Sequence, residues 1–302
     1  NEQVVASINK DDITADDLYD ESTPYDGSTI YNMYKNAVID QSIKTTKDLK
    51  KQASTLESNI KSNASSQSDD YESTLTTELA KYGYASYEEL NEYCLTSVKE
   101  KEMNKKYITK HFDEVKKAWE EKSPRTVSII KMEVSDADNL TETEAKKKSN
   151  IEKALEKESF ADVAKAFSED SNTANKKGFA GYIDSDSTSS DSSSTSTVPA
   201  DVVTAAIALK KGETSDWVTV TSSSGTSLYK VYVTETNAKK IFSAKSDTVS
   251  HQALYAILNS DSSLSYKILD SYAKKLDIKF NDKDTKKKFD RYVKTTYGGD
   301  QQ

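Results

Sequence analysis

Residues 160–233 constrain the fold more than any other stretch of the chain. Four apolar residues near its start recur at positions i, i+3, i+4 and i+7, the spacing of one buried helix face: Phe160, Val163, Ala164 and Phe167. A turn, a glycine-punctuated strand over 178–183 and a serine- and threonine-rich tract follow. A short alanine-rich helix then ends at Leu209, and two strands are predicted over 217–221 and 228–233.

This order of elements resembles a parvulin-type peptidyl-prolyl isomerase domain. The family pattern runs F-A-x-x-A-x-x-[YF]-S-x-D, G-x-L-G-[WY]-[FI], V-P, A-A-[FI]-x-L-K-x-G-[ED]-x-S and G-[YW]-H-[IL]. The residues that match it are Phe160, Ala161, Ala164, Phe167, Ser168, Asp170, Gly178, Gly181, Tyr182, Ile183, Val198, Pro199, Ala205, Ala206, Ile207, Leu209, Lys210, Gly212, Glu213, Ser215, Gly225 and Leu228. Each motif is short, and it is their shared order that carries the resemblance. It implies a small antiparallel sheet with helices.

The resemblance also marks site positions, and here the chain departs from the family. Parvulins carry two histidines in the centre of the sheet, and this sequence has Ile129 at or next to the first position and Ser227 at the second. The acidic position of bacterial members is Asp170, for which we expect a turn or capping role rather than catalysis. The implied substrate-binding positions are Val198, Val202, Tyr182 and Ile183.

Composition excludes several other classes of protein. A formal net charge of −8 and a pI near 5.1 argue against nucleic-acid binding. Cys94 is the only cysteine, so neither an intramolecular disulfide nor a cysteine metal site is expected. The two histidines, His111 and His251, lie far apart and no nucleophile motif accompanies them, which leaves a hydrolase triad without support. No phosphate-binding glycine motif occurs, and we predict no metal and no cofactor.

The flanks of the parvulin-like stretch differ from it in charge. Residues 1–123 carry 16 Lys and Arg against 24 Asp and Glu, whereas residues 239–302 carry 13 against 8. Opposite net charges favour docking of the two flanks, and a tail this short is expected to share its core with the front segment. We therefore predict an α+β protein in which a mostly helical domain, built from 1–123 and 239–302, receives a parvulin-like domain over 124–238. Within the latter, residues 185–197 are only Ser, Thr and Asp, which predicts a disordered insertion.

The N-terminus adds a second resemblance. A short strand over 4–9 and a helical turn over 13–19 carry the pattern V-A-x-x-x-x-x-x-I-T-x-x-D-[LF]-Y, which is similar to the opening of the PrsA/PrtM-type extracellular foldases of Gram-positive bacteria. The resemblance implies a lipid-anchored foldase on the outer face of the cell membrane, with its anchoring cysteine upstream of Asn1. Its partners would be unfolded or partly folded exported proteins, and a homodimer would be expected.

Three functions follow from these observations. The first is a chaperone whose parvulin-like domain is structural or binds peptide, and the second is an active prolyl isomerase. The third is a wall-associated interaction protein that uses the fold as a spacer. Catalysis of an X-Pro bond must lower a barrier of about 18–20 kcal/mol, and the paired histidines that parvulins use are replaced here. The sequence therefore favours the chaperone, and the enzymatic assignment stays open.

Overall fold

The computed structural model describes residues 4–8, 11–14, 27–188, 198–276 and 278–298, and the chain forms two compact units. Unit 1 comprises residues 1–110 and 262–302, and unit 2 comprises residues 111–261. The mixed α+β class predicted from the sequence is confirmed. Among the described residues, no helix combines the length and the apolar character that a membrane crossing requires.

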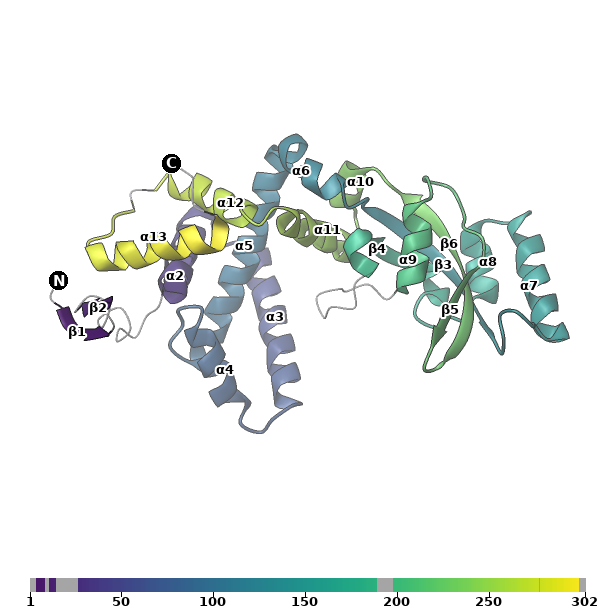
Figure 1. The fold of residues 1–302 in the computed structure, drawn as a ribbon, viewed down its shortest axis with the longest axis horizontal. Coiled ribbons are helices and arrows are strands. Elements are labelled where there is room, and N and C mark those ends of the chain that lie inside the picture. Colours follow the sequence, from purple (N-terminus) through teal and green to yellow (C-terminus); the bar gives the residue numbers. More distant parts are fainter. Residues whose placement is uncertain (1–3, 9–10, 15–26, 189–197, 277, 299–302) are drawn as a thin grey trace. The chain divides into compact units, whose positions relative to one another are not determined.

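Unit 1 is helical apart from one hairpin. Its elements are β1 (Val4–Ile8), β2 (Asp11–Thr14), α2 (Gly27–Ser42), α3 (Lys47–Ser65), α4 (Tyr71–Ala80), the 3-10 turn η1 (Tyr87–Glu89), α5 (Leu90–Lys110), α12 (Leu264–Ala273) and α13 (Lys283–Tyr297). Helices α3 and α5 lie side by side, and α2 contacts α5, α12 and α13 (Figure 1). The predicted helical turn over 13–19 is wrong at its start, because Ile13 and Thr14 pair with β1 as a strand. The rest of that turn lies outside the described residues.

An aromatic cluster joins the two ends of the chain within unit 1. The ring of Tyr31 on α2 lies 6.1 Å from that of Phe289, 5.2 Å from Tyr292 and 5.5 Å from Tyr297, all three on α13. Tyr31 and Phe289 are only 4% and 6% exposed. Buried aromatic pairs of this kind contribute beyond the area that they remove from water, so the N- and C-terminal segments share one core in this unit.

Two local features differ from what the sequence suggests. Helical periodicity continues from 104 to 122, but α5 ends at Lys110 and α6 (Phe112–Glu120) starts after His111, whose φ and ψ of −110° and 25° are not helical. The Ser86 to Glu89 spacing resembles a capping box. In the structure the Ser86 side chain accepts no cap hydrogen bond, and the Glu89 carboxylate instead accepts one from the backbone N–H of Ala85.

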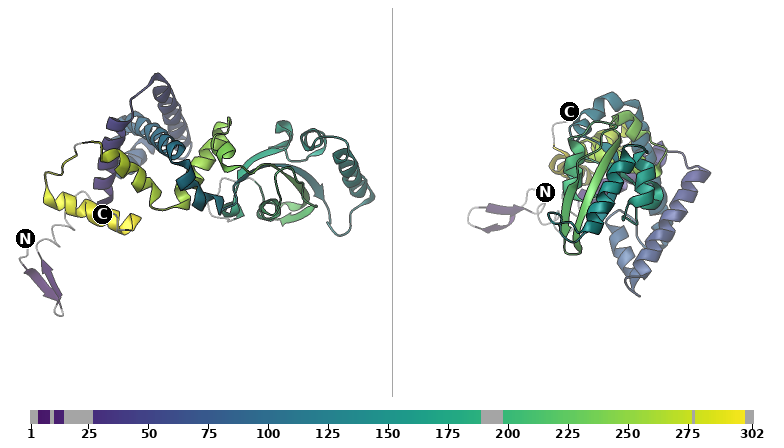
Figure 2. Two further views of the ribbon diagram at one scale, coloured as in Figure 1. Left: turned by 90° about the horizontal axis from the view of Figure 1, so that it is seen from above. Right: turned by 90° about the vertical axis from the view of Figure 1, so that its right-hand side faces the viewer.

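Unit 2 is built on a four-stranded antiparallel sheet of order β4-β3-β6-β5. Its elements are α6, β3 (Arg125–Val134), α7 (Glu142–Leu155), α8 (Phe160–Phe167), η2 (Ala174–Lys176), β4 (Phe179–Ile183), η3 (Ser185–Thr188), α9 (Ala200–Ile207), β5 (Val218–Ser222), β6 (Gly225–Glu235), α10 (Ala238–Phe242) and α11 (Asp247–Ser260). Helix α9 covers one face of the sheet, whereas α7 and α8 cover the other (Figures 1 and 2).

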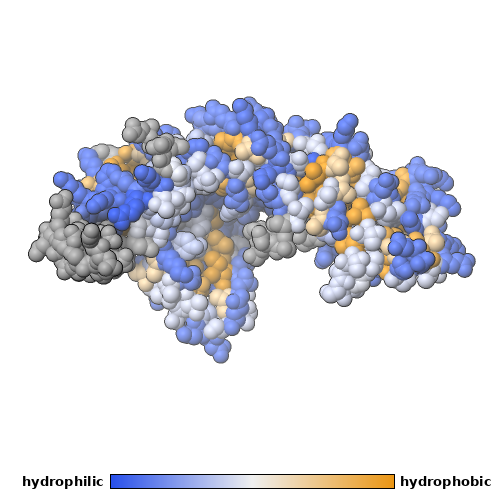
Figure 3. Space-filling view, viewed as in Figure 1, coloured by the Kyte–Doolittle hydropathy of each residue, from blue (hydrophilic) through white to orange (hydrophobic). Residues whose placement is uncertain are grey.

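The strands of unit 2 carry a buried residue set on each face. Along β3, Val127 and Ile129 belong to the cluster under α9, whereas Ile130 and Met132 belong to the cluster under α7 and α8. This alternation is the two-residue period of a strand that is buried on both faces. In the space-filling view, apolar side chains gather over the α9 region of unit 2 and between α3 and α5 of unit 1 (Figure 3).

The two units divide the chain at other residues than those expected. The boundaries lie at 110/111 and 261/262, whereas the sequence suggested 123/124 and 238/239. Helices α6, α10 and α11 therefore belong with the sheet. Contacts on α6 account for this, since Phe112 lies 5.4 Å from Phe242 of α10 and Trp119 donates a hydrogen bond of 2.8 Å to Tyr182 of β4.

The predicted disordered insertion begins too early. Its first four residues form η3, and they do so because the buried Asp184 accepts hydrogen bonds at Oδ1 from the backbone N–H groups of Asp186 and Ser187, at 3.0 and 3.1 Å. An Asx turn of this kind fixes the local backbone through side-chain-to-backbone hydrogen bonds. Residues 189–197 of the insertion lie outside the described residues.

Candidate functional site

Three of the four residues implied in substrate binding come together with Ile129, the first histidine position, but as core. Ile129, Ile183, Val198 and Val202 all belong to the cluster between the sheet and α9. Their exposed fractions are 1%, 0%, 4% and 0%. Burial of this degree is typical of packing residues. In this structure the four side chains hold α9 to the sheet and offer no open surface to a ligand.

The two histidine positions do not meet. In the register of β3 and β6, Ile129 pairs with Val231 and Ser227 pairs with Glu133. The two positions share a face of the sheet but are four residues apart along the strand, which corresponds to about 13 Å. Ile129 lies in a cluster of buried apolar residues, against which Tyr229 also packs. No imidazole pair or equivalent acid–base pair is therefore formed by these two residues.

Between the two positions the sheet carries a polar pair, Lys131 opposite Tyr229. The Lys131 ammonium lies 2.8 Å from Oε1 of Glu133, and this hydrogen bond raises the pKa of Lys131 against the opposing effect of burial. Burial raises the pKa of Tyr229, which the charge of Lys131 partly offsets. At neutral pH the pair therefore presents a charged ammonium and a neutral phenol.

Asp170 lies in the loop after α8 and organises a turn. Its carboxylate accepts hydrogen bonds from the backbone N–H of Asn172 at 3.1 Å and from the hydroxyl of Thr173 at 2.8 Å. This arrangement is an Asx turn. The neighbouring Glu169 fixes the same loop to β3, because its carboxylate accepts from the backbone N–H of Glu133 at 2.6 Å. Asp170 thus has a structural partner for each carboxylate oxygen.

A glycine allows this loop to approach the sheet closely. Gly178 has φ of +80° and its backbone carbonyl accepts a hydrogen bond of 2.8 Å from Ile129. A Cβ atom added at Gly178 would lie 2.6 Å from the Cβ of Ala164 and 2.7 Å from the carbonyl oxygen of Ile129. Both the backbone conformation and the space therefore require glycine here. Ala164 and Gly178, two of the motif residues, are in contact for this reason.

Tyr182 takes part in a buried hydrogen-bond chain that the sequence did not reveal. Trp119 Nε1 donates to the Tyr182 hydroxyl at 2.8 Å, and that hydroxyl donates to Oδ2 of Asp184 at 2.6 Å. Burial and the charge of Asp184 raise the pKa of Tyr182. Trp119 and Asp184 carry no motif that marks them, and Trp119 precedes the domain boundary expected from the sequence. Tyr182, expected to bind substrate, instead connects β4 to α6.

Residues 129–232 match the family model described as the rotamase, PPIC-type PPIase domain. The sheet and helices of unit 2 thus contain a parvulin-type domain, as the motifs predicted. A comparison with curated proteins finds no match.

Over its whole length the chain is similar to solved structures of foldases. It is 22% identical to PrsA from Bacillus subtilis, with a TM-score of 0.44 and coverage of 95% of this chain and 98% of that one. It is 23% identical to foldase protein PrsA from Streptococcus pneumoniae str. Canada MDR_19A, with a TM-score of 0.39 and coverage of 96% and 99%. A structure titled for the SurA-like chaperones PEB4 and Cj1289 of Campylobacter jejuni matches at 13% identity and a TM-score of 0.26, with coverage of 92% and 100%. The domain assignment rests on the PPIC match.

Proposed function

We propose that the protein is a foldase that holds partly folded exported proteins and whose PPIC-type domain has little or no isomerase activity. The observation that carries this proposal is the apolar, closed environment of Ile129, at the position where parvulins have a histidine. An isomerase stabilises a twisted amide better than either planar form, and the buried apolar side chains around Ile129 offer no hydrogen bond to that state. Holding a client requires only surface that unfolded chains bind.

The same proposal includes the setting that the resemblance implies. The protein would act on the outer face of a Gram-positive cell membrane, attached by a lipid on a cysteine upstream of Asn1, and would form a homodimer. The N-terminal sequence pattern that resembles PrsA/PrtM-type foldases supports this setting. Unit 1 contains fourteen of the eighteen tyrosines and would supply amphipathic contacts to clients.

A second candidate function is an active prolyl isomerase. The observation that favours it is the PPIC match together with the pair Lys131 and Tyr229, which lies between the two lost histidine positions. An ammonium and a phenol can both donate hydrogen bonds to a substrate carbonyl. This pair would then replace the histidines.

A protease-coupled or NMR exchange assay on an X-Pro peptide separates the two. The foldase proposal predicts a rate close to the uncatalysed one, and it predicts that Asp170→Ala leaves this rate unchanged because Asp170 only organises a turn. The same substitution is expected to lower the free energy of unfolding by about 1 kcal/mol. A clear rate enhancement that Lys131→Met or Tyr229→Phe abolishes would instead establish the isomerase.

A further inference from the structure

Unit 1 contains a groove of about 680 Å³. It is lined by one face of α2, by the loop at residues 83–84, by η1 and by the first half of α5. This volume is within the range of sites that bind small ligands or a few side chains of a peptide. All of its walls come from unit 1.

Specific hydrogen bonds fix the position of the loop that forms one wall of the groove. Asn36 Nδ2 on α2 donates to the carbonyl of Tyr82 at 2.8 Å. The Tyr84 hydroxyl donates to Oγ1 of Thr96 on α5, also at 2.8 Å. Gly83 between them has φ of +86°, and a Cβ added there would lie 2.7 Å from Cγ of Met33. The chain thus passes directly against Met33.

The wall formed by α2 is apolar at its centre. Met33, Ala37 and Asp40 follow one another at i, i+4 and i+7 and are all exposed, so they form one stripe along the helix. The Met33 side chain is 47% exposed, and only three large hydrophobic residues are exposed in the described part of the chain. A second of these is Tyr82, the neighbour of Gly83. Exposed methionine provides an adaptable surface for apolar side chains.

The charged part of the lining is acidic. It includes the four carboxylates of Asp40, Glu88, Glu89 and Glu92, and no Lys, Arg or His is among the described lining residues. Asp40 already pairs with Lys99 at 2.5 Å, and Glu89 accepts from a backbone N–H. Glu88 and Glu92 are exposed. A hydrogen bond from Ser86 lowers the pKa of Glu88, so this carboxylate stays charged to a lower pH than an ordinary glutamate.

The spacing of these acids favours a peptide over a metal ion as the occupant. In the described ranges, no group of three or more His, Cys, Asp or Glu is arranged to hold a metal. Separate carboxylates around an exposed methionine instead match a chain that carries an apolar side chain and, next to it, a cationic one.

We propose that this groove binds an unfolded segment of client protein in which Lys or Arg lies next to an apolar side chain. The apolar side chain would lie on Met33 and Ala37, and the cation would lie between Glu88 and Glu92. This inference rests on the proposed holding function and adds a sequence preference to it. Segments with acidic residues in place of the cations would be disfavoured by the same carboxylates.

Fluorescence anisotropy of the full chain with two dye-labelled unstructured peptides tests the proposal. One peptide contains Leu–Lys pairs separated by Gly and Ser, and the other has Glu in place of each Lys. We expect tighter binding of the lysine peptide, weakened by added salt. Replacing both exposed carboxylates (Glu88→Gln with Glu92→Gln) should weaken its binding about fivefold. Ala37→Trp, at an exposed position of α2, should fill the groove and weaken both peptides.

A matched control removes the same charge elsewhere in unit 1. Asp69→Asn with Glu72→Gln changes two exposed carboxylates outside the groove, and it should leave the affinity unchanged. Equal weakening by this control would show a diffuse charge effect and overturn the proposal, as would a normal affinity in Ala37→Trp or displacement of the peptide by 1 mM Ca²⁺. Suppression of client aggregation, measured in parallel, separates a failure of the groove assignment from a failure of the proposed holding function. If the wild-type chain protects clients but the groove variants bind peptide normally, only the groove assignment fails.

Discussion

At the scale of single residues, the series of buried hydrogen bonds from Trp119 through Tyr182 to Asp184 is the feature most open to test. Tyr182→Phe keeps the ring but removes the hydroxyl that Trp119 donates to and that donates to Asp184. Because both partners lose a bond inside the protein, we expect the free energy of unfolding to fall by about 1–3 kcal/mol. Chemical denaturation followed by circular dichroism measures it.

The matched control is Tyr229→Phe in the same sheet. Tyr229 is half-buried, and its loss of a hydroxyl should change the free energy of unfolding by less than about 0.5 kcal/mol. Equal effects of the two substitutions would show that the hydrogen bonds of Tyr182 add no more to the free energy of unfolding than the half-buried hydroxyl of Tyr229 does.

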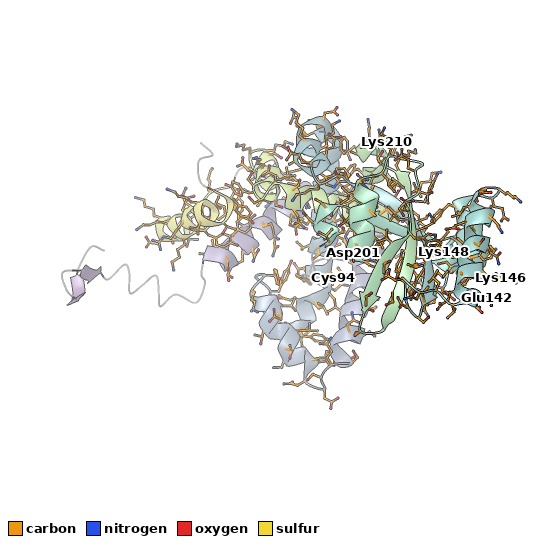
Figure 4. All side chains as sticks on the ribbon, turned by 45° about the vertical axis from the view of Figure 1, so that its right-hand side comes forward. Cys94, Glu142, Lys146, Lys148, Asp201 and Lys210 are labelled. Carbon is orange, nitrogen blue, oxygen red and sulfur yellow. The ribbon has the colours of Figure 1, made fainter. Side chains whose placement is uncertain are left out.

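Cys94 provides a second test at this scale, through its pH dependence. The side chain is fully buried inside unit 1 (Figure 4), and burial raises the pKa of its thiol to about 11 from an ordinary value of 9.0. A raised pKa means that the protonated thiol stabilises the fold fully below pH 9 and that this contribution is lost as the pH rises through 11. We therefore expect no reaction with a thiol reagent at pH 8 until denaturant unfolds the protein. Rapid labelling of the native chain would contradict this burial.

At the scale of elements, α13 is expected to be essential to unit 1 through one side chain. Phe289→Ala removes a ring that is 6% exposed and packs against Tyr31, Tyr34 and Phe280. We expect the free energy of unfolding to fall by about 3–5 kcal/mol. The exposed Lys287→Ala on the same helix is the control and should change it little. A small effect of Phe289→Ala would mean that the C-terminal helix is not part of the core shared with α2.

Elements with strong local patterns could be predicted from the sequence, whereas those set by distant contacts could not. The four apolar residues of α8 lie on one helix face as predicted, and Phe160, Val163 and Ala164 are buried in the cluster under the sheet. The break at His111 left no signal, because both flanking sequences keep a helical period, and α6 packs on the distant elements α10, α11 and β4.

The site was harder to predict than the fold for the same reason. Motif order located Ile129 and Ser227, but only the strand register shows that they are four residues apart along the sheet. A register depends on pairing partners and bulges, and a bulge lies between Thr126 and Val127 at the start of this pairing. The groove of unit 1 gave no motif at all, since its walls come from α2 and from a loop some fifty residues later.

At the scale of the whole molecule, we expect the protein to protect its clients without isomerising X-Pro bonds. The fold contains a PPIC-type domain, yet the described site lacks an acid–base pair at the histidine positions, and the groove that we propose for unfolded chains lies in unit 1. A fold alone does not establish an activity. Whether clients need an X-Pro bond is therefore the question that separates the holding function from catalysis.

Light scattering of an aggregation-prone exported protein and of its proline-free variant, each with and without the full-length chain, answers this question. Holding by surface contacts predicts that both clients are protected equally at equal molar ratios, because no step involves proline. Protection of the proline-containing client alone would contradict the account and would assign the function to isomerisation by the PPIC-type domain.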